Sequence, residues 1–152
     1  PPGSPPVPHT RHVRPGPRCL WTPRPAPTSP RNPDEHVNAA GYRGPLLEPT
    51  PPSAPFRIAF LGDSSTFGWG VPNEKTYAAT CAANLTASGI PTESLNAGVI
   101  GYTIAQGTVR YNDLVRPHHP DVVVIAFGAI NDHLHGPGQE SDESKKIGRA
   151  HV

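Results

Sequence analysis

Apolar residues along the chain gather in short runs that alternate with longer amphipathic stretches. Residues 56–61 and 121–127 are runs bounded by turn residues, which is typical of buried strands, and a further strand is expected over 92–95. The stretches 74–88 and 104–115 carry apolar residues at helical spacing. The order strand, helix, strand, helix, strand predicts an α/β fold with a three-layer, doubly wound parallel sheet. Any site is expected outside the carboxyl ends of the strands.

Both predicted helices have recognisable ends. The first is expected to begin with Asn73 as its N-cap and to end before Gly89 and Pro91. The second is expected to be capped by Thr103 and stopped by Pro117. The residues expected on the inward faces are Tyr77, Ala78, Cys81, Ala82 and Leu85 in the first helix, and Ile104, Thr108, Tyr111 and Val115 in the second.

Residues 121–127 form the clearest strand of the chain. Asp121 is followed by a continuous run of β-branched and other apolar residues that ends at Phe127. A strand that is apolar on both faces is typical of a parallel sheet whose two faces are covered by helices. We therefore expect this run to be a central strand.

The front third of the chain has a different composition. Of the 22 prolines, 17 lie in residues 1–55. We interpret residues 1–17 as a disordered arm rich in proline and arginine. Residues 18–55 are expected to be an extended lead-in that packs against the domain without forming its core. Residues 56–140 are expected to be the first part of one folded domain.

Charge, cysteine content and hydropathy exclude several classes of protein. The formal net charge is +1, so no nucleic-acid partner is expected. Cys19 and Cys81 lie far apart, and they predict neither a disulfide framework nor a metal knuckle. No apolar run approaches the roughly 18–20 residues of a membrane helix. The chain contains no methionine, so we expect the translation start to be missing, and localisation (cytoplasmic or exported) and oligomeric state stay open.

Three turns carry chemically informative residues, one turn after each predicted strand. They are Asp63, Ser64 and Ser65 in the first turn, Asn96, Gly98 and Gly101 in the second, and Gly128, Asn131 and Asp132 in the third. In a parallel sheet these turns meet at one edge. A serine hydroxyl, a glycine N–H and an asparagine amide are the groups needed to attack a carbonyl carbon and to hold the oxyanion that forms. Each turn alone has an ordinary structural explanation, but their succession predicts an active site.

The three turns resemble blocks I, II and III of the SGNH hydrolases, also called the GDSL esterase/lipase family, which has a flavodoxin-like sheet. The matching segments are Gly62-Asp63-Ser64, Asn96 through Gly101-Tyr102-Thr103, and Gly128 through Asn131-Asp132. The segment Asn38-Ala39-Ala40-Gly41-Tyr42-Arg43-Gly44 is similar to the lead-in of bacterial members. The resemblance implies Ser64 as the nucleophile and an oxyanion hole made by the N–H groups of Ser64 and Gly101 with the amide of Asn131. Asp63 and Asp132 would support these residues, and no cofactor is needed.

The chain departs from the family pattern in two places. Block III reads Gly128-Ala129-Ile130-Asn131-Asp132, which is either one residue longer than Gly-x-Asn-Asp or has Ala129 in place of glycine. The family's catalytic Asp and His belong to an Asp-x-x-His motif, and none begins after Asp132, the last residue of block III. Residues 147–152 resemble the translation of a sequencing adaptor, so 141–152 are expected to be a non-native tail. The fold is therefore expected to be incomplete at the C-terminus, and the fragment itself to be inactive.

The sequence thus predicts a serine hydrolase acting on a small-molecule or polysaccharide-linked ester. The alternative is a non-catalytic relative that binds carbohydrate or acyl groups. The chain has no Gly-x-Ser-x-Gly elbow and no phosphate-binding loop that ends in Lys-Ser or Lys-Thr, which disfavours those two kinds of site. A metal site from His118 and His119, or from His133 and His135, stays open but lacks a carboxylate or cysteine partner at ligand spacing.

Overall fold

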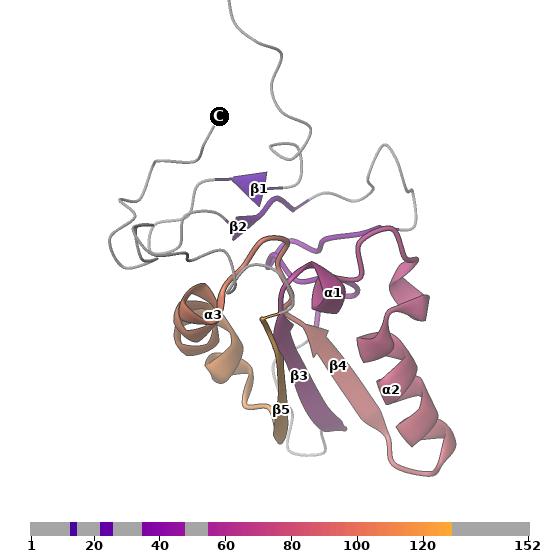
Figure 1. Cartoon of the computed structure of the whole chain (residues 1–152). Coiled ribbons are helices and arrows are strands. Elements are labelled where there is room, and N and C mark those ends of the chain that lie inside the picture. Colours follow the sequence, from indigo (N-terminus) through magenta and orange to yellow (C-terminus); the bar gives the residue numbers. More distant parts are fainter. Residues whose placement is uncertain (1–12, 15–21, 26–34, 48–54, 129–152) are drawn as a thin grey trace, which may run out of the picture.

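The predicted strands pair as one parallel sheet in the order β4-β3-β5 (Figure 1). The computed structural model describes residues 13–14, 22–25, 35–47 and 55–128. The elements in chain order are β1 (Val13–Arg14), β2 (Thr22–Pro23), β3 (Phe56–Gly62), α1 (Ser64–Phe67), a 3₁₀ turn (Asn73–Lys75), α2 (Tyr77–Ala87), β4 (Thr92–Asn96), α3 (Ile104–Arg110), a π-helical turn (Tyr111–Val115), a 3₁₀ turn (Arg116–His118) and β5 (Val122–Ala126). All three strands predicted from the sequence are confirmed.

The strand order fixes where a site can form. The chain runs from β3 through α2 to β4 on one side, and then crosses through α3 to β5 on the other side. Phe60 pairs with Asn96 and Leu61 pairs with Ile125, so the three carboxyl ends lie at one edge. In sheets of this kind ligands bind where the strand order changes direction, outside the carboxyl ends. Here that point lies between β3 and β5, beside the turn that begins with Asp63.

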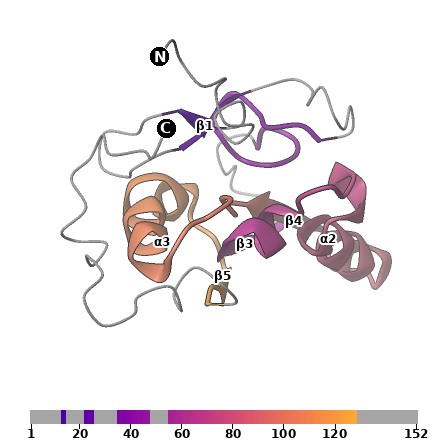
Figure 2. The ribbon, with the colours of Figure 1, turned by 45° about the horizontal axis from the view of Figure 1, so that its top comes forward.

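Helices cover both faces of the sheet, because α2 and α3 lie on opposite sides of the strands (Figure 2). Successive side chains of a strand point to opposite faces. On one face Ile58 and Phe60 pack with Ala78 of α2. On the other face Leu61 belongs to a cluster that contains Val115, from the helical turns after α3. The expected three-layer α/β architecture is therefore confirmed.

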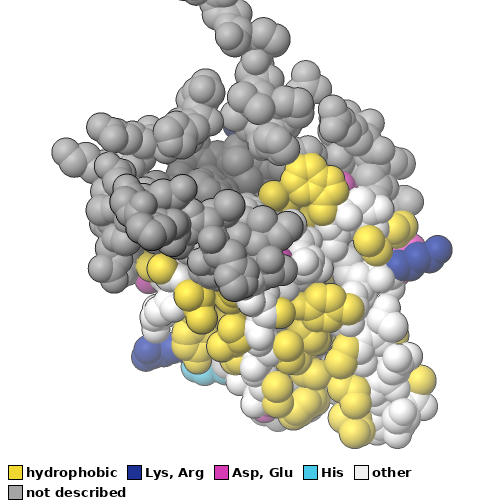
Figure 3. All heavy atoms as spheres, viewed as in Figure 1, with side chains coloured by type: hydrophobic (Ala, Val, Ile, Leu, Met, Phe, Trp, Pro, Cys, Tyr) yellow, Lys and Arg dark blue, Asp and Glu magenta, His cyan; other side chains and the backbone are white. Residues whose placement is uncertain are grey.

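The run 121–127 forms a strand, but not the central one in the described part of the chain. There β3 has a partner on each side, whereas β5 pairs with β3 alone. Ile125 of β5 is 63% exposed. Hydrophobic side chains are also visible on the outer surface over the strand layer (Figure 3). The apolar run correctly predicted a strand, but it did not determine the position of that strand in the sheet.

The first predicted helix begins later than expected. Its N-cap is Thr76, whose hydroxyl accepts a hydrogen bond from the N–H of Ala79 at 3.3 Å, while Asn73 begins a separate 3₁₀ turn. The reason lies in a distant segment, because the side-chain oxygen of Asn73 accepts hydrogen bonds from Arg43 Nε and from the N–H of His36. That oxygen is therefore not used to cap the helix.

The inward face of α2 is narrower than predicted. Ala78 and Ala82 are buried, and Cys81 and Leu85 are partly buried against the same face of the sheet, as expected. Tyr77 is exposed over much of its surface, although its ring packs edge-on against Phe60 at 5.4 Å between centroids.

The inward face predicted for the second helix is partly wrong. Ile104 and Thr108 are exposed, and the buried positions are instead Gln106, Gly107 and Arg110 in α3, followed by Val115. Gly107 lies so close to the ring of Phe127 that any Cβ would overlap it. Gly107 thus allows a close approach of α3 to Phe127. Ile104 and Thr108, although exposed, line a hollow together with Ile125 of β5. Tyr111 is partly buried against the core cluster, as expected.

The ends of the second helix agree better with the prediction. Thr103 caps α3 as expected, and its N–H donates to Gln106 Oε1 at 3.1 Å. Pro117 lies in the 3₁₀ turn that follows the helical stretch.

The lead-in contributes to the core, contrary to expectation. Tyr42 is only 3% exposed and belongs to the apolar cluster of β3 and β4. The guanidinium of Arg110 lies over the Tyr42 ring, 5.2 Å from its centroid. Residues 35–47 are thus built into the domain at this point rather than laid on its surface.

The remaining expectations about the ends of the chain are tested little by the structure. Strand β1, in the predicted arm, pairs in antiparallel fashion with β2, in the lead-in. The predicted tail, together with Asn131 and Asp132, lies outside the described residues. The boundaries of arm, lead-in, domain and tail stay predictions. Among the described helices none is long and apolar enough to cross a membrane.

Candidate active site

Ser64 is the first residue of α1 and follows β3 after a single intervening residue, Asp63. Asp63 is buried, and its carboxylate accepts a hydrogen bond from the N–H of Ser65 at 2.9 Å. The helix ends at once, because Gly68 adopts a φ of 75°. Asp63 therefore shapes the turn as its N-cap and leaves the half-buried Ser64 at the carboxyl edge of the sheet.

Glycines let this turn pack unusually closely. A Cβ at Gly62 would overlap the side chain of Thr66 and the carbonyl of Ala126 on β5. A Cβ at Gly98 would overlap the backbone of Phe67. Gly62 thus allows α1 to approach β5, and Gly98 allows the second turn to approach α1. This packing explains the presence of Gly98 without any role in catalysis.

The second turn is bonded to the first. Asn96 Nδ2 donates to the carbonyl of Thr66 at 2.9 Å, and the N–H of Val99 donates to the carbonyl of Gly62 at 3.0 Å. Gly101 follows in the same turn with a φ of 77°, a conformation that favours glycine. The structure therefore brings the turns of Ser64 and Gly101 into direct contact, as the sequence predicts.

The third turn is described only at its start. Gly128 follows β5 and has a φ of 102°. Asn131 and Asp132 lie outside the described residues, so their predicted roles stay predictions. His133 and His135 lie there as well. Within residues 35–47 and 55–128, no group of three His, Cys, Asp or Glu side chains is arranged to hold a metal ion.

Two side chains that hold the Ser64 turn were not identified from the sequence. Arg43 is buried, and its guanidinium donates to the carbonyls of Phe67 and Gly68 at 2.9 and 2.7 Å. The hydroxyl of Tyr77 donates to Thr66 Oγ1 at 2.8 Å. Arg43 was part of the lead-in motif, but the motif gave it no role. Nothing in the local pattern of the first predicted helix pointed to the bond from Tyr77.

The Tyr77 hydroxyl remains a donor throughout the neutral range. Burial raises the pKa of Tyr77, the hydrogen bond to Thr66 lowers it, and the nearby charge of Asp63 raises it. Burial is the strongest of these influences, so the net pKa lies above its ordinary value. The hydroxyl therefore keeps its proton and its bond to α1.

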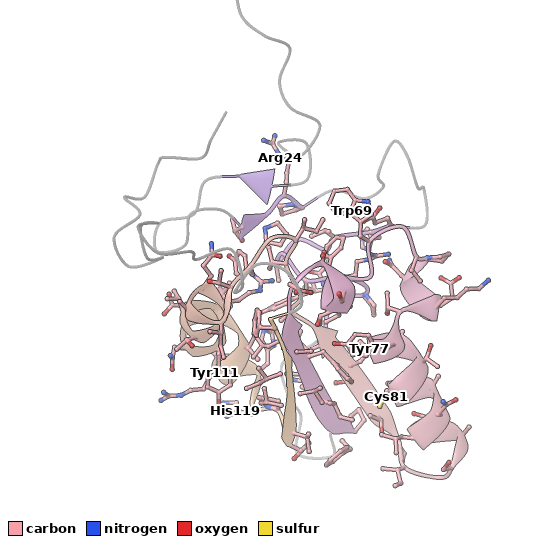
Figure 4. All side chains as sticks on the ribbon, viewed as in Figure 1. Arg24, Trp69, Tyr77, Cys81, Tyr111 and His119 are labelled. Carbon is pink, nitrogen blue, oxygen red and sulfur yellow. The ribbon has the colours of Figure 1, made fainter. Side chains whose placement is uncertain are left out.

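An aromatic side chain is exposed close to Ser64. Trp69 lies on the turn that follows α1, and its backbone N–H donates to the carbonyl of Ser64 at 3.3 Å. The residue is 43% exposed, and Figure 4 shows it at the edge of the sheet where the site turns lie.

Comparisons with known proteins show which proteins this chain is similar to. The model of the GDSL-like lipase/acylhydrolase family matches residues 60–149. An arylesterase of Vibrio mimicus is 34% identical over 80 residues, which are 53% of this chain and 40% of that protein. The chain thus spans less than half the length of this curated relative.

Two solved structures are also similar to this chain. The crystal structure of AlinE4, an SGNH-hydrolase family esterase, is 29% identical with a TM-score of 0.46, and the match covers 58% of this chain and 44% of that one. The crystal structure of TesA is 28% identical with a TM-score of 0.45, and the match covers 47% of this chain and 40% of that one.

Proposed function

Because this chain belongs to the GDSL-like lipase/acylhydrolase family, we propose that the protein is a serine hydrolase of ester bonds with Ser64 as its nucleophile. One observation carries the proposal. Ser64 starts the turn after the central strand β3, beside the point where the strand order changes, and the Gly101 turn packs against that same turn. This is the position at which sheets of this type bind ligands.

The proposed reaction has two halves. In the first, Ser64 Oγ attacks the carbonyl carbon of the ester and gives its proton to a base, which passes it to the departing alcohol as the C–O bond breaks. In the second, water attacks the acyl-serine, the carboxylic acid leaves, and Ser64 regains its proton. The family's base is the histidine of an Asp-x-x-His motif. In this chain the spacing occurs once, as Asp132-His133-Leu134-His135, and its Asp132 already belongs to block III. We therefore propose a base outside this sequence and expect the present chain alone to be inactive.

The oxyanion formed in each half would be held by three donors. They are the N–H groups of Ser64 and Gly101 and the side-chain amide of Asn131, with Asp63 and Asp132 in support. A donor aimed at the oxyanion acts mainly in the transition state, and the loss of one typically lowers kcat by about 10²–10³. We expect Asn131→Ala to lower kcat by about this factor with little change in KM, whereas an unchanged kcat would reject the role of Asn131.

The substrate is proposed to be a small-molecule or polysaccharide-linked ester. The curated relative is named an arylesterase, which makes phenyl acetate a suitable first substrate. Trp69, exposed beside Ser64, would contact a phenyl group if that group lies on this side of the site.

Ser65 provides a matched control for the nucleophile. It follows Ser64 directly and its side chain is exposed, while its N–H bonds to Asp63 in a way that alanine preserves. In protein expressed from the complete reading frame, Ser64→Ala is expected to lower kcat for phenyl acetate by a factor of about 10⁴ or more. Ser65→Ala is expected to retain the activity of the unaltered protein. Hydrolysis that survives Ser64→Ala would contradict the proposal, and folded protein without any hydrolysis would favour the binding-module alternative.

A further inference from the structure

We propose that Arg43, in the lead-in, is a positioning residue that keeps the turn carrying Ser64 in its reactive geometry. The inference rests on the proposed function, because it assigns a purpose to Arg43 only if Ser64 reacts. It extends the site to a segment that precedes the sheet and contains none of the predicted catalytic groups.

The contacts of the Arg43 guanidinium converge on the backbone just after Ser64. The side chain donates to the carbonyls of Phe67 and Gly68, at 2.9 and 2.7 Å, and to the carbonyl of Val71. The carbonyls at the end of a helix have no partner within the helix. Arg43 supplies that partner for α1, which is too short to be stable through its own hydrogen bonds.

The guanidinium also contacts side chains around the same turn. It lies over the ring of Phe67, with 4.8 Å between the guanidinium carbon and the ring centroid. Its Nε donates to the side chain of Asn73, and the Glu35 carboxylate lies 3.6 Å away. The planar fork of N–H groups thus serves several acceptors in fixed directions. A lysine ammonium, which is a single point charge, cannot reproduce this set of contacts.

The backbone of Arg43 is held independently of its side chain. Its N–H donates to the carbonyl of Asn96 at 3.0 Å, which attaches the lead-in to the end of β4. The Asn38 side-chain oxygen accepts from the N–H of Tyr42 at 3.1 Å and orders the preceding loop. Arg110 of α3 donates to the carbonyls of Gly41 and Ala97, at 2.7 and 2.8 Å. Arg43 therefore extends from a fixed point between the two site turns.

Burial and hydrogen bonding alone would also be expected of an arginine that only stabilises the fold. Arg57 is such a residue, and it provides the matched control. It is 2% exposed, against 4% for Arg43. Its guanidinium donates to Glu93 and to the carbonyl of His118. Because Arg57 lies near the start of β3, these contacts are at the amino ends of the strands, away from Ser64.

The test compares Arg43→Lys with Arg57→Lys in protein expressed from the complete reading frame. The thermal unfolding midpoint, kcat and KM for phenyl acetate, and the second-order rate constant of labelling by a fluorophosphonate are measured for each, well below the midpoint. Both variants are expected to unfold at lower temperature. Only Arg43→Lys is expected to lose about tenfold or more in labelling rate and in kcat, with KM nearly unchanged, because small displacements of a nucleophile cost large factors in rate.

The outcomes separate the two proposals. Labelling of Arg43→Lys at the unaltered rate, or an equal loss in Arg57→Lys, would overturn the positioning role while leaving Ser64 as the nucleophile. Unaltered protein that is folded but not labelled would overturn the proposed function, and this inference with it. If Arg43→Lys does not fold, Asn73→Ala replaces it. This change removes an acceptor of the guanidinium in the 3₁₀ turn at Asn73–Lys75, together with the bond from the N–H of His36. A severalfold slower labelling of Asn73→Ala supports the role, and an unchanged rate overturns it.

Discussion

Arg43 and Arg57 are both buried, but they bond to different kinds of partner at opposite ends of the sheet. Arg57 pairs with a carboxylate, at 2.7 Å to Glu93, and these two residues are also cross-strand neighbours in β3 and β4. Arg43 bonds chiefly to backbone carbonyls of the turn after α1. The Arg57 contacts hold two strands together, whereas the Arg43 contacts determine the path of the chain next to Ser64.

This difference separates stability from reactivity. A salt bridge between strands contributes to the free energy of unfolding but leaves the turns at the far edge unchanged. Hydrogen bonds to carbonyls of a short turn fix the direction in which its side chains project. Changes at the carboxyl edge are therefore expected to lower both stability and the reactivity of Ser64, and changes at the amino edge to lower stability alone.

Gly98→Ala is the strongest way to disturb the carboxyl edge. The new Cβ would overlap the backbone of Phe67 and push the second turn away from α1. We expect a loss of about 3 kcal/mol in the free energy of unfolding, measured with urea, and a large fall in fluorophosphonate labelling.

Gly89→Ala is the control for this change at the amino edge. Gly89 has a φ of 92° but open space around it, so the cost is about 1–2 kcal/mol from backbone strain, with labelling unchanged. A Gly98→Ala variant as stable and as reactive as the unaltered protein would contradict the close packing of the two turns.

Glu93→Ala tests the amino edge. The substitution leaves the buried Arg57 guanidinium without its carboxylate, and we expect a loss of about 2 kcal/mol in urea unfolding because an unpaired buried charge is costly. Labelling of Ser64 and kcat are expected to stay at the unaltered values. A proportional loss of labelling would show that the two edges are coupled, and that contacts at the amino edge affect the reactivity of Ser64 as well as stability.

Tyr77→Phe should act at the carboxyl edge with a smaller effect. It removes the donor to the hydroxyl of Thr66, a residue that is fully buried and lies next to Gly62. The expected cost is about 1 kcal/mol, with labelling slowed severalfold. Tyr111→Phe is the control, since the Tyr111 hydroxyl makes no hydrogen bond among the described residues. Equal effects of the two substitutions would contradict a specific role for the bond to Thr66.

His118 should give the smallest effect, and only on the pH dependence of stability. Burial lowers the pKa of His118, as do Arg57 and His119, so the folded state disfavours the charged imidazole. The unfolded state therefore binds more protons as the pH falls below about 6.5, and stability declines there. His118→Gln is expected to lose less stability than the unaltered protein between about pH 7.5 and about pH 5.5, as measured by urea midpoints. Identical losses in both proteins would contradict this assignment.

The sequence predicted the features that depend on neighbouring residues, and it failed where distant residues decide. The strands at β3 and β5 were recognisable because their apolar runs are continuous. The start of α2 was misplaced because Asn73 bonds to Arg43, thirty positions away in the chain. The inward face of α3 was misjudged because Gly107 fits against Phe127, which follows β5 and is distant in the chain.

The candidate site shows the same division. The motif around Ser64 and the glycine of the second turn could be read directly, since each follows a strand. The residues that hold those turns could not, because Arg43 and Tyr77 reach them from separate segments. The role of Asn131 stays a prediction.

The central claim is that Ser64 is the nucleophile, and locating a covalent adduct tests it most directly. Protein expressed from the complete reading frame is treated with a fluorophosphonate, digested, and analysed by mass spectrometry of the peptides. We expect one phosphonyl group on Ser64 and none on Ser65, and we expect ester hydrolysis to decline in step with adduct formation. An adduct on a different residue, or hydrolysis that continues after Ser64 is fully modified, would contradict the account.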